Sequence, residues 1–459
     1  MQRCVRPAPR RKGHTLPRRR VGGIHRGDPG LTRGRGDASV GGVAAKSRKT
    51  EPREPSPGAE PHAWQFKPRF RRAAFGWKSQ PAIERIGQAV AEIKKVARNN
   101  PRLGAEGAVL FLERLSPAIE QVDSSSGAIG SCVSRAISEL APIIAAAPAE
   151  PKTRGGWLER LFDAYLADNI PYIEELGDAW GTLCGSNAVA SAWADRLLPR
   201  TCESLRPNGG PAKYSKCTAV CLSSLFQAQR FDELIDLVRA ANSWSNRRWA
   251  VRAMAATGRI DEAIRFAEAS RGPYSSDGPI DAECEELLLA AGFSDEAYAQ
   301  YGIRSNQRGT YLATFRAIAK KYPNKPPRDI LMDLARSTPR EEGKWFAAAK
   351  DAGLFDEALA LASRSPCDPK TLTRAAREFT ETRPAFAVGA GLLAMHWLVQ
   401  GYGYEITGLD VRAAYHATLA AAKKSGQEQE AKERIRRMVV AGTAGRQFVA
   451  DILGRELSA

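Results

Sequence analysis

The stretch GRIDEAI, residues 258–264, recurs in this chain with small changes, as QRFDELI at 229–235, GFSDEAY at 292–298 and GLFDEAL at 353–359. In three of the four copies the first residue is a glycine, which can take the left-handed backbone conformation that ends a helix. The Asp-Glu pair that follows is expected to cap the next helix and to complement its positive end. Each copy therefore predicts a turn between two helices.

The apolar residues after each turn keep a helical period. Phe231, Leu234, Ile235 and Val238 fall at positions i, i+3, i+4 and i+7, and residues 260–267 repeat this pattern. A helix with one apolar face must bury that face against a neighbour. We therefore expect the helices on both sides of each turn to pack together as a pair.

The spacing of the copies indicates a repeat. Their aspartates stand at 232, 261, 295 and 356, so the separations are 29, 34 and 61 residues. The last separation corresponds to two units, with one diverged turn between them. A period of roughly 34 residues is typical of helix-turn-helix repeats, which must stack to hide their apolar faces. The sequence predicts an all-α fold, an α-solenoid of stacked antiparallel helix pairs.

Two resemblances accompany this pattern. Over about 214–364 the chain resembles the tetratricopeptide-like class in its small residues and its Gly-x-apolar-Asp-Glu-Ala positions, although the Trp-Leu-Gly-Tyr signature of that family is missing. Unrelated helical hairpins with the same turn chemistry are the alternative. The segments GTYLATFRAIAKKYP, EEGKWFAAAKDAG, SPCDPKTLTRAAREF and GYGYEITGLDV resemble an uncharacterised bacterial family of helical-repeat proteins. That resemblance implies no catalytic or binding residues.

Helical patterns also flank the repeats. In an N-terminal helical region, 73–206, helices are expected at about 81–99, 102–122, 127–147, 154–168, 171–184 and 187–205. A Pro-Asn-Gly-Gly-Pro break then precedes the repeats, 207–365. Later helices are expected at about 309–321, 327–337, 341–352, 369–381, 384–400, 409–425, 427–440 and 445–456. The C-terminal helical region, 366–459, would cap the array, and whether the N-terminal helices join it stays open.

The positive charge of the chain is concentrated at its start. Residues 1–72 hold 19 Lys and Arg against 5 Asp and Glu, which gives +14 of the total +17. This Arg/Gly/Pro-rich tail is predicted to be disordered, and it could act as an arm for phosphate backbones or acidic partners. The alternatives are a solvated tail without a role, or an untranslated upstream extension. Because the next methionine is Met254, such an extension would imply a non-ATG start.

A second basic stretch lies in the connection AKKYPNKPPRD. Lys320, Lys321, Lys325 and Arg328 surround Tyr322, and four cations with an aromatic ring could bind an acidic peptide or a phosphate backbone. The alternative is a solvated, proline-stiffened loop. The 387 residues after the tail hold 49 basic against 46 acidic side chains, so the high pI of the whole chain does not itself indicate a nucleic-acid-binding protein.

Motifs for catalysis, cofactors or metals are missing. The sequence has no P-loop, His-Glu-x-x-His, Gly-x-Ser-x-Gly or Cys-x-x-Cys pattern. His396 and His416, the imidazoles outside the tail, are interpreted as ordinary helix residues. The glycines of GYGYEITGLD do not follow the dinucleotide-binding spacing, so this stretch is predicted to be a loop between helices, with Tyr402 and Tyr404 packed beneath it.

No targeting signal is recognised, and the most apolar run, Ala385–Val399, is too short to cross a bilayer. The expected location is the cytoplasm, without membrane contact. We expect a non-catalytic scaffold that binds a protein or peptide partner and needs no cofactor or metal. The alternative is a nucleic-acid-associated protein that binds phosphate backbones through the tail and the loop from Lys320 to Arg328.

Overall fold

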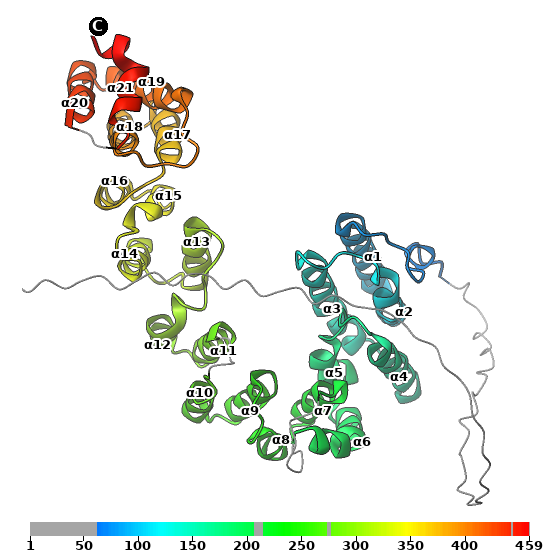
Figure 1. The fold of residues 1–459 in the computed structure, drawn as a ribbon. Helices are drawn as coiled ribbons and strands as arrows, with labels where there is room; N and C mark the ends of the chain where they lie inside the picture. Colours follow the sequence, from blue (N-terminus) through cyan, green and yellow to red (C-terminus); the bar gives the residue numbers. More distant parts are fainter. Residues whose placement is uncertain (1–61, 206–213, 273–276, 442–443, 459) are drawn as a thin grey trace, which may run out of the picture. The chain divides into compact units, whose positions relative to one another are not determined.

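The computed structural model describes residues 62–205, 214–272, 277–441 and 444–458 (Figure 1). Within these ranges all regular structure is helical, with 21 α-helices, two short 3₁₀ segments, one π-helical turn and no strand. Residues Ala63–Ala459 form one compact unit. The predicted all-α class is confirmed for this part of the chain. Most of the predicted disordered tail, residues 1–61, lies outside the described residues, as does the predicted break at 206–213.

The helices that precede the repeats follow the predicted boundaries closely. They are α1 (Ser79–Asn99), α2 (Pro101–Ile119), α3 (Ala128–Ala146), α4 (Pro151–Ala167), α5 (Leu176–Cys184) and α6 (Asn187–Leu205). The repeats contain α7 (Lys216–Gln227), α8 (Phe231–Val238), α9 (Trp244–Ala256), α10 (Ile260–Glu268), α11 (Asp277–Ala290), α12 (Ser294–Ala297), the π-helical turn η2 (Tyr298–Gly302), α13 (Tyr311–Lys321), α14 (Pro327–Ser337), the 3₁₀ turn η3 (Glu342–Trp345), α15 (Phe346–Asp351) and α16 (Phe355–Arg364). The C-terminal helices are α17 (Pro369–Phe379), α18 (Pro384–Val399), α19 (Gly408–Lys424), α20 (Glu428–Ala441) and α21 (Arg446–Ser458).

The four recurring turns share one backbone geometry. Gly258, Gly292 and Gly353 have φ values of 80°, 86° and 75°, and Gln229 takes 60° at the matching position. The N–H of Gly258 donates to the Ala255 carbonyl at 2.9 Å, and the next N–H reaches the Met254 carbonyl at 2.9 Å. The other three copies repeat both hydrogen bonds, which define the Schellman motif. The predicted turns are therefore confirmed.

The predicted capping role of the Asp-Glu pairs is wrong. The residues that precede the second helices are Arg230, Arg259, Phe293 and Leu354, and none makes a side-chain cap. The acidic pairs lie inside the first turn instead, where their charge complements the positive end of the helix. The diverged fifth turn lies between α13 and α14, and α14 carries Asp329 in its first turn.

Each helix packs mainly against the next one or two along the chain. Such contacts join α1 to α2 and α3, α2 to α4, and α3 to α5, and the pattern continues to η2 and again from α13 as far as α19 with α20 and α21. Helix α7 packs against both α5 and α6, so the N-terminal helices and the first repeat share one continuous packing arrangement. The same local packing is visible among α17, α18 and α19 (Figure 1).

The helical unit begins earlier than the predicted tail boundary at residue 72. Trp64, Phe66 and Phe70 are buried, and the rings of Phe66 and Phe70 lie 5.5 and 5.0 Å from that of Phe111 on α2. The Trp64 ring lies so close to Gly107 that a Cβ there would approach it to 2.2 Å. Residues 63–72 therefore belong to the packed unit, because their aromatic side chains cover the first helices.

One described helix, α3, is long and apolar enough to cross a bilayer by length and composition. Its residues Ile129, Val133, Ile137 and Leu140 are fully or almost fully buried, and the helix packs against α1, α2 and α5. These contacts are those of a core helix in a helical protein.

Candidate functional site

The predicted interaction loop folds back onto the protein at its start. The Lys321 ammonium lies 2.5 Å from one carboxylate oxygen of Glu285, and the Tyr322 hydroxyl donates to the other at 2.5 Å. The Tyr322 ring is buried. The Lys321 ammonium and the Tyr322 hydroxyl thus both bind the buried carboxylate of Glu285 on α11, so both polar groups already have a partner within the protein.

The rest of this loop is also partly neutralised. Arg328 pairs with Glu357 at 2.6 Å, and the Lys325 ammonium lies 4.2 Å above the Tyr298 ring and 3.9 Å from Asp333. Lys320 is exposed and forms no ion pair within the described ranges. The structure therefore does not bring the five predicted residues to one free basic surface. That this loop binds a partner stays a prediction, and it rests chiefly on Lys320.

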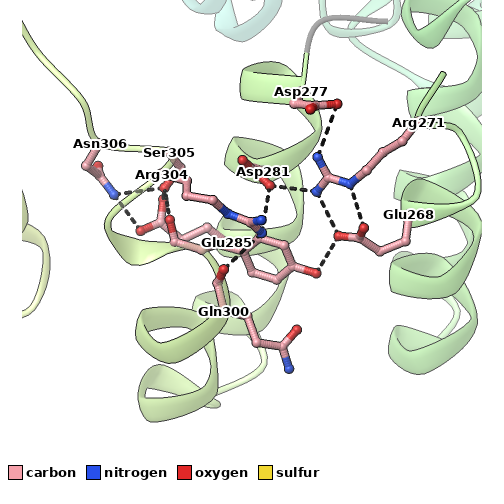
Figure 2. Close-up of polar contacts among 10 residues, drawn as sticks. Glu268, Arg271, Asp277, Asp281, Glu285, Gln300, Arg304, Ser305 and Asn306 are labelled. Atoms are coloured by element: carbon pink, nitrogen blue, oxygen red, sulfur yellow. Dashed lines mark hydrogen bonds and ion pairs between the residues drawn. The ribbon is translucent and has the colours of Figure 1, made fainter. Parts of the chain in front are cut away.

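Glu285 belongs to a larger group of interacting polar residues, which we call the α11 cluster; Figure 2 shows most of it, without Lys321 and Tyr322. The group is centred on Asp281 and Glu285 of α11 and draws partners from α10, η2, α13 and the connections after them. Its members are Glu268, Arg271, Asp281, Glu285, Tyr301, Arg304, Ser305, Asn306, Lys321 and Tyr322.

The carboxylate of Glu285 is fully buried and has four hydrogen-bond donors. Besides Lys321 and Tyr322, the Ser305 hydroxyl donates to it at 2.6 Å and the Asn306 amide at 2.7 Å. Burial raises the pKa of Glu285, but the hydrogen bonds from these four side chains outweigh it and leave the pKa below its usual range. The carboxylate is therefore held in its charged form.

The other half of the cluster is a chain of ion pairs (Figure 2). Arg271 contacts both carboxylate oxygens of Glu268, at 2.6 and 2.8 Å, and also reaches Asp281 at 2.6 Å. Arg304 lies 3.2 Å from the same buried Asp281. Bidentate arginine pairs of this kind fix orientation as well as charge. Each buried carboxylate of the cluster thus has at least one cationic partner.

The π-helical turn η2 connects this cluster in both directions along the chain. The Tyr301 hydroxyl donates to Glu268 on α10 at 2.8 Å, and the Tyr298 hydroxyl donates to Asp333 on α14 at 2.8 Å. The Tyr298 ring also meets the Tyr322 ring edge-on at 5.1 Å between centroids. A π turn adds a residue to a helical turn, which shifts the side chains that follow. Here tyrosines three residues apart reach helices on opposite sides.

The junction between η2 and α13 depends on these long side chains. The main helix-to-helix contacts of the described part stop at η2 and resume at α13, whereas elsewhere each helix packs against at least one of the next two along the chain. Glu285 with Lys321 and Tyr322, and Tyr298 with Asp333, bridge this junction. A groove of about 790 Å³ lies on it, and its lining includes Tyr298, Arg304, Lys325 and Asp333. The cluster therefore serves as the joint between two packed stretches.

Several ionisable groups of the cluster have shifted pKa values. A carboxylate that acts as a general acid or base works best with a pKa near the working pH, but Glu285 and Glu268 both have lowered pKa values, the latter chiefly through the hydrogen bond from Arg271. Burial raises the pKa of the neighbouring Cys284 thiol to about 11, which leaves little reactive thiolate at neutral pH. Within the described ranges no group of three or more His, Cys, Asp and Glu residues could hold a metal ion.

The two histidines have different surroundings. His396 packs edge-on against Trp397, and burial lowers its pKa. His416 is exposed on α19, and its Nε2 lies 3.5 Å from Glu456 on α21. Each ring thus has its own neighbour, as expected for ordinary helix residues. The seven cysteines of the described ranges are all free.

Comparison of the chain with protein-family models finds no match. A search among curated proteins also finds none. The resemblances to the tetratricopeptide-like class and to a bacterial helical-repeat family therefore stay predictions from the residues quoted above.

Proposed function

We propose that this chain is a non-catalytic scaffold that binds a protein or peptide partner, built as a tetratricopeptide-like α-solenoid. The observation that carries the proposal is the restriction of the main helix contacts to near neighbours along the chain, together with four copies of one turn geometry. Helix pairs that pack only on their neighbours form arrays with long accessible surfaces, and arrays of this kind commonly bind peptides. The step from array to partner binding is an argument from fold analogy.

The α11 cluster supports a scaffold more than an enzyme. A buried ionisable cluster is a reason to consider catalysis. In this cluster, however, the charges of Glu285 and Asp281 are balanced by Lys321, Arg271 and Arg304, and the hydrogen bonds stabilise the charged state. Such a network resists proton transfer and favours one fixed arrangement of the joint.

The proposal is tested by affinity capture from the native host, with untreated and nuclease-treated lysate passed separately over the full-length chain and over residues 62–459. A protein retained by both, whose purified form then binds residues 62–459 with a saturable, measurable Kd, supports the scaffold. Retention of nucleic acid alone, and only by the full-length chain, contradicts it. Circular dichroism shows whether the shortened chain keeps the helical content of the full one.

A second function, nucleic-acid association, is favoured by one observation, the +14 charge of residues 1–72. Binding through such a tail releases counterions, so its affinity should fall steeply as salt increases. Deletion of residues 1–61 should then remove most of the binding to a labelled duplex. Binding that survives both the deletion and about 0.2 M salt would contradict a role for the tail.

A further inference from the structure

The connection between α18 and α19 and the first turn of α19 each place one large apolar side chain in solvent. Tyr404 is 81% exposed and Leu409 is 77% exposed. The prediction that Tyr404 packs beneath the loop is thus wrong, because the backbone turns its ring outward. Tyr404 and Leu409 lie on either side of Thr407, the N-cap of α19. Contiguous exposed apolar patches on a folded surface are typical of interaction sites.

This connection is nevertheless held firmly. The Tyr402 N–H donates to the Trp397 carbonyl at 2.8 Å, and Thr407 and Asp410 form a reciprocal capping box at the start of α19. The Lys370 ammonium, from α17, donates to the Glu405 carbonyl at 3.0 Å. Glu405 itself has a φ of 47°, a left-handed conformation that strains a residue other than glycine. Strained backbone that its surroundings keep in place is frequent at binding sites.

A cavity of about 210 Å³ adjoins the connection, between α17 and α19. Arg374 and Arg377, one helical turn apart on α17, line it, and both are exposed and form no ion pair within the described ranges. Asp410 is the one carboxylate of the lining. It already accepts hydrogen bonds from Thr407, and the Lys370 ammonium of the same lining lies 3.7 Å from it. The cavity therefore presents two guanidinium groups without carboxylate partners, and Leu409 directly precedes Asp410 of its lining on α19.

We propose that this surface, formed by Arg374, Arg377, Tyr404 and Leu409, binds an acidic segment of a partner protein that also carries an apolar side chain. The proposal rests on the scaffold function proposed above and locates its site. Guanidinium groups bind carboxylates through paired hydrogen bonds, and the apolar side chain is buried on Tyr404 and Leu409. Because the connection is already fixed, little ordering entropy opposes binding. A bare phosphate backbone would leave Leu409 unused.

The test uses the full-length chain and a fluorescein-labelled synthetic peptide of Glu and Asp residues with one Phe and one Leu, followed by fluorescence polarisation. We expect saturable binding that the double substitution Arg374→Glu with Arg377→Glu weakens at least about tenfold. The same peptide with Gln and Asn in place of the acids should bind about tenfold more weakly. Tyr404→Ser with Leu409→Ser should weaken binding about fivefold.

The matched control is Lys95→Glu with Arg98→Glu, an exposed basic pair of the same spacing on α1 that lines another groove, between α1 and α3. It makes the same change in net charge and should leave the affinity within about twofold. Circular dichroism shows whether the reversed charges disturb folding. If they do, Arg374→Gln with Arg377→Gln, which only removes charge, replaces the Glu variant in the binding measurement.

Two results would overturn the proposal. One is the absence of saturable binding up to about 1 mM peptide. The other is an equal loss of affinity in the Arg374→Glu with Arg377→Glu variant and in the Lys95→Glu with Arg98→Glu control. Greater loss in the Lys95 and Arg98 variant would move the site to the α1–α3 groove and leave the scaffold function intact. The scaffold function itself fails only if, in addition, the capture experiment finds no protein retained by residues 62–459.

Discussion

Gln229 occupies the position that is a glycine in the other three recurring turns, and its φ of 60° lies in the left-handed region. This conformation costs a residue with a Cβ roughly 1 kcal/mol, whereas glycine takes it freely. Gln229→Gly should therefore raise the free energy of unfolding by about 0.5 kcal/mol, after the greater entropy of glycine in the unfolded chain is deducted. Urea denaturation of the two proteins measures this.

The control for this prediction is the same replacement two residues earlier. Gln227 is the last residue of α7, so Gln227→Gly should lower the free energy of unfolding by up to about 1 kcal/mol. Gly258→Ala, at a φ of 80°, should also destabilise the chain by about 1 kcal/mol. Destabilisation by Gln229→Gly would show that the Gln229 side chain makes a contribution larger than its backbone strain.

Glu285 is the residue on which the α11 cluster depends most. Glu285→Gln removes the buried charge that faces Lys321, and it should lower the free energy of unfolding at pH 7 by about 3 kcal/mol. Glu286→Gln, one position along α11 and exposed, should change it by less than about 0.5 kcal/mol. Urea denaturation at fixed pH gives both values.

The effect of Glu285 also has a pH dependence with a definite sign. Its pKa is lowered in the folded protein, so its charge stabilises the fold fully above the carboxyl pKa of the unfolded chain, about 4.3. As the pH falls below that value towards the lowered pKa, this stability is lost. The difference between the wild type and Glu285→Gln should therefore narrow on acidification. A difference that stays constant would mean that the pKa of Glu285 is the same in the folded and unfolded states.

Few residues of the cluster could be foreseen from the sequence. Lys321 and Tyr322 attracted attention as part of a basic loop, but their partner Glu285 is 36 and 37 residues away and no motif links them. Nothing in the sequence marks Asp281 and Glu285 as buried, because acidic side chains are rarely buried unless paired. Only the packing of η2 and α13 on α11 brings the pairing partners together.

At the level of helices, most of the architecture was predictable. The left-handed glycine and the 3.6-residue apolar period are local signals, so the turns at Gly258, Gly292 and Gly353 and the helices around them were identified from the sequence. The start of the unit was missed, because Trp64, Phe66 and Phe70 precede the first helical period and their burial requires Phe111 of α2. Two further Schellman turns, at Gly401 and Gly426, had no Asp-Glu pair to mark them.

The segment before α1 provides a comparison of two tryptophans. Trp64 is buried against α2, whereas Trp77 is 72% exposed. Trp64→Ala should lower the free energy of unfolding by about 3 kcal/mol, and Trp77→Ala should change it by less than about 0.5 kcal/mol. Thermal denaturation followed by circular dichroism can rank the two variants. Similar melting temperatures for the two variants would mean that residues 63–72 are not part of the packed unit.

The whole unit should respond locally to a local defect, because its main contacts join only near neighbours. Glu285→Ala weakens the joint between η2 and α13, so amide hydrogen exchange should accelerate about tenfold or more in α11 and α13. Exchange in α1 to α4 should stay within about twofold of the wild type. Native-state hydrogen exchange with mass spectrometry measures both regions. Uniform acceleration along the chain would contradict an array of locally packed pairs.

The joint at α11 also limits how this protein can be rearranged by recombination. The Glu285 carboxylate is paired with Lys321 and Tyr322 of the following helix pair. If another helix pair of this chain followed α11 instead, the buried carboxylate of Glu285 would lose these two partners. A duplication that copied α11 without α13 would create the same fault. The helix pairs share one turn geometry but are not interchangeable, because the pair that contains α11 needs side chains from the pair that follows it.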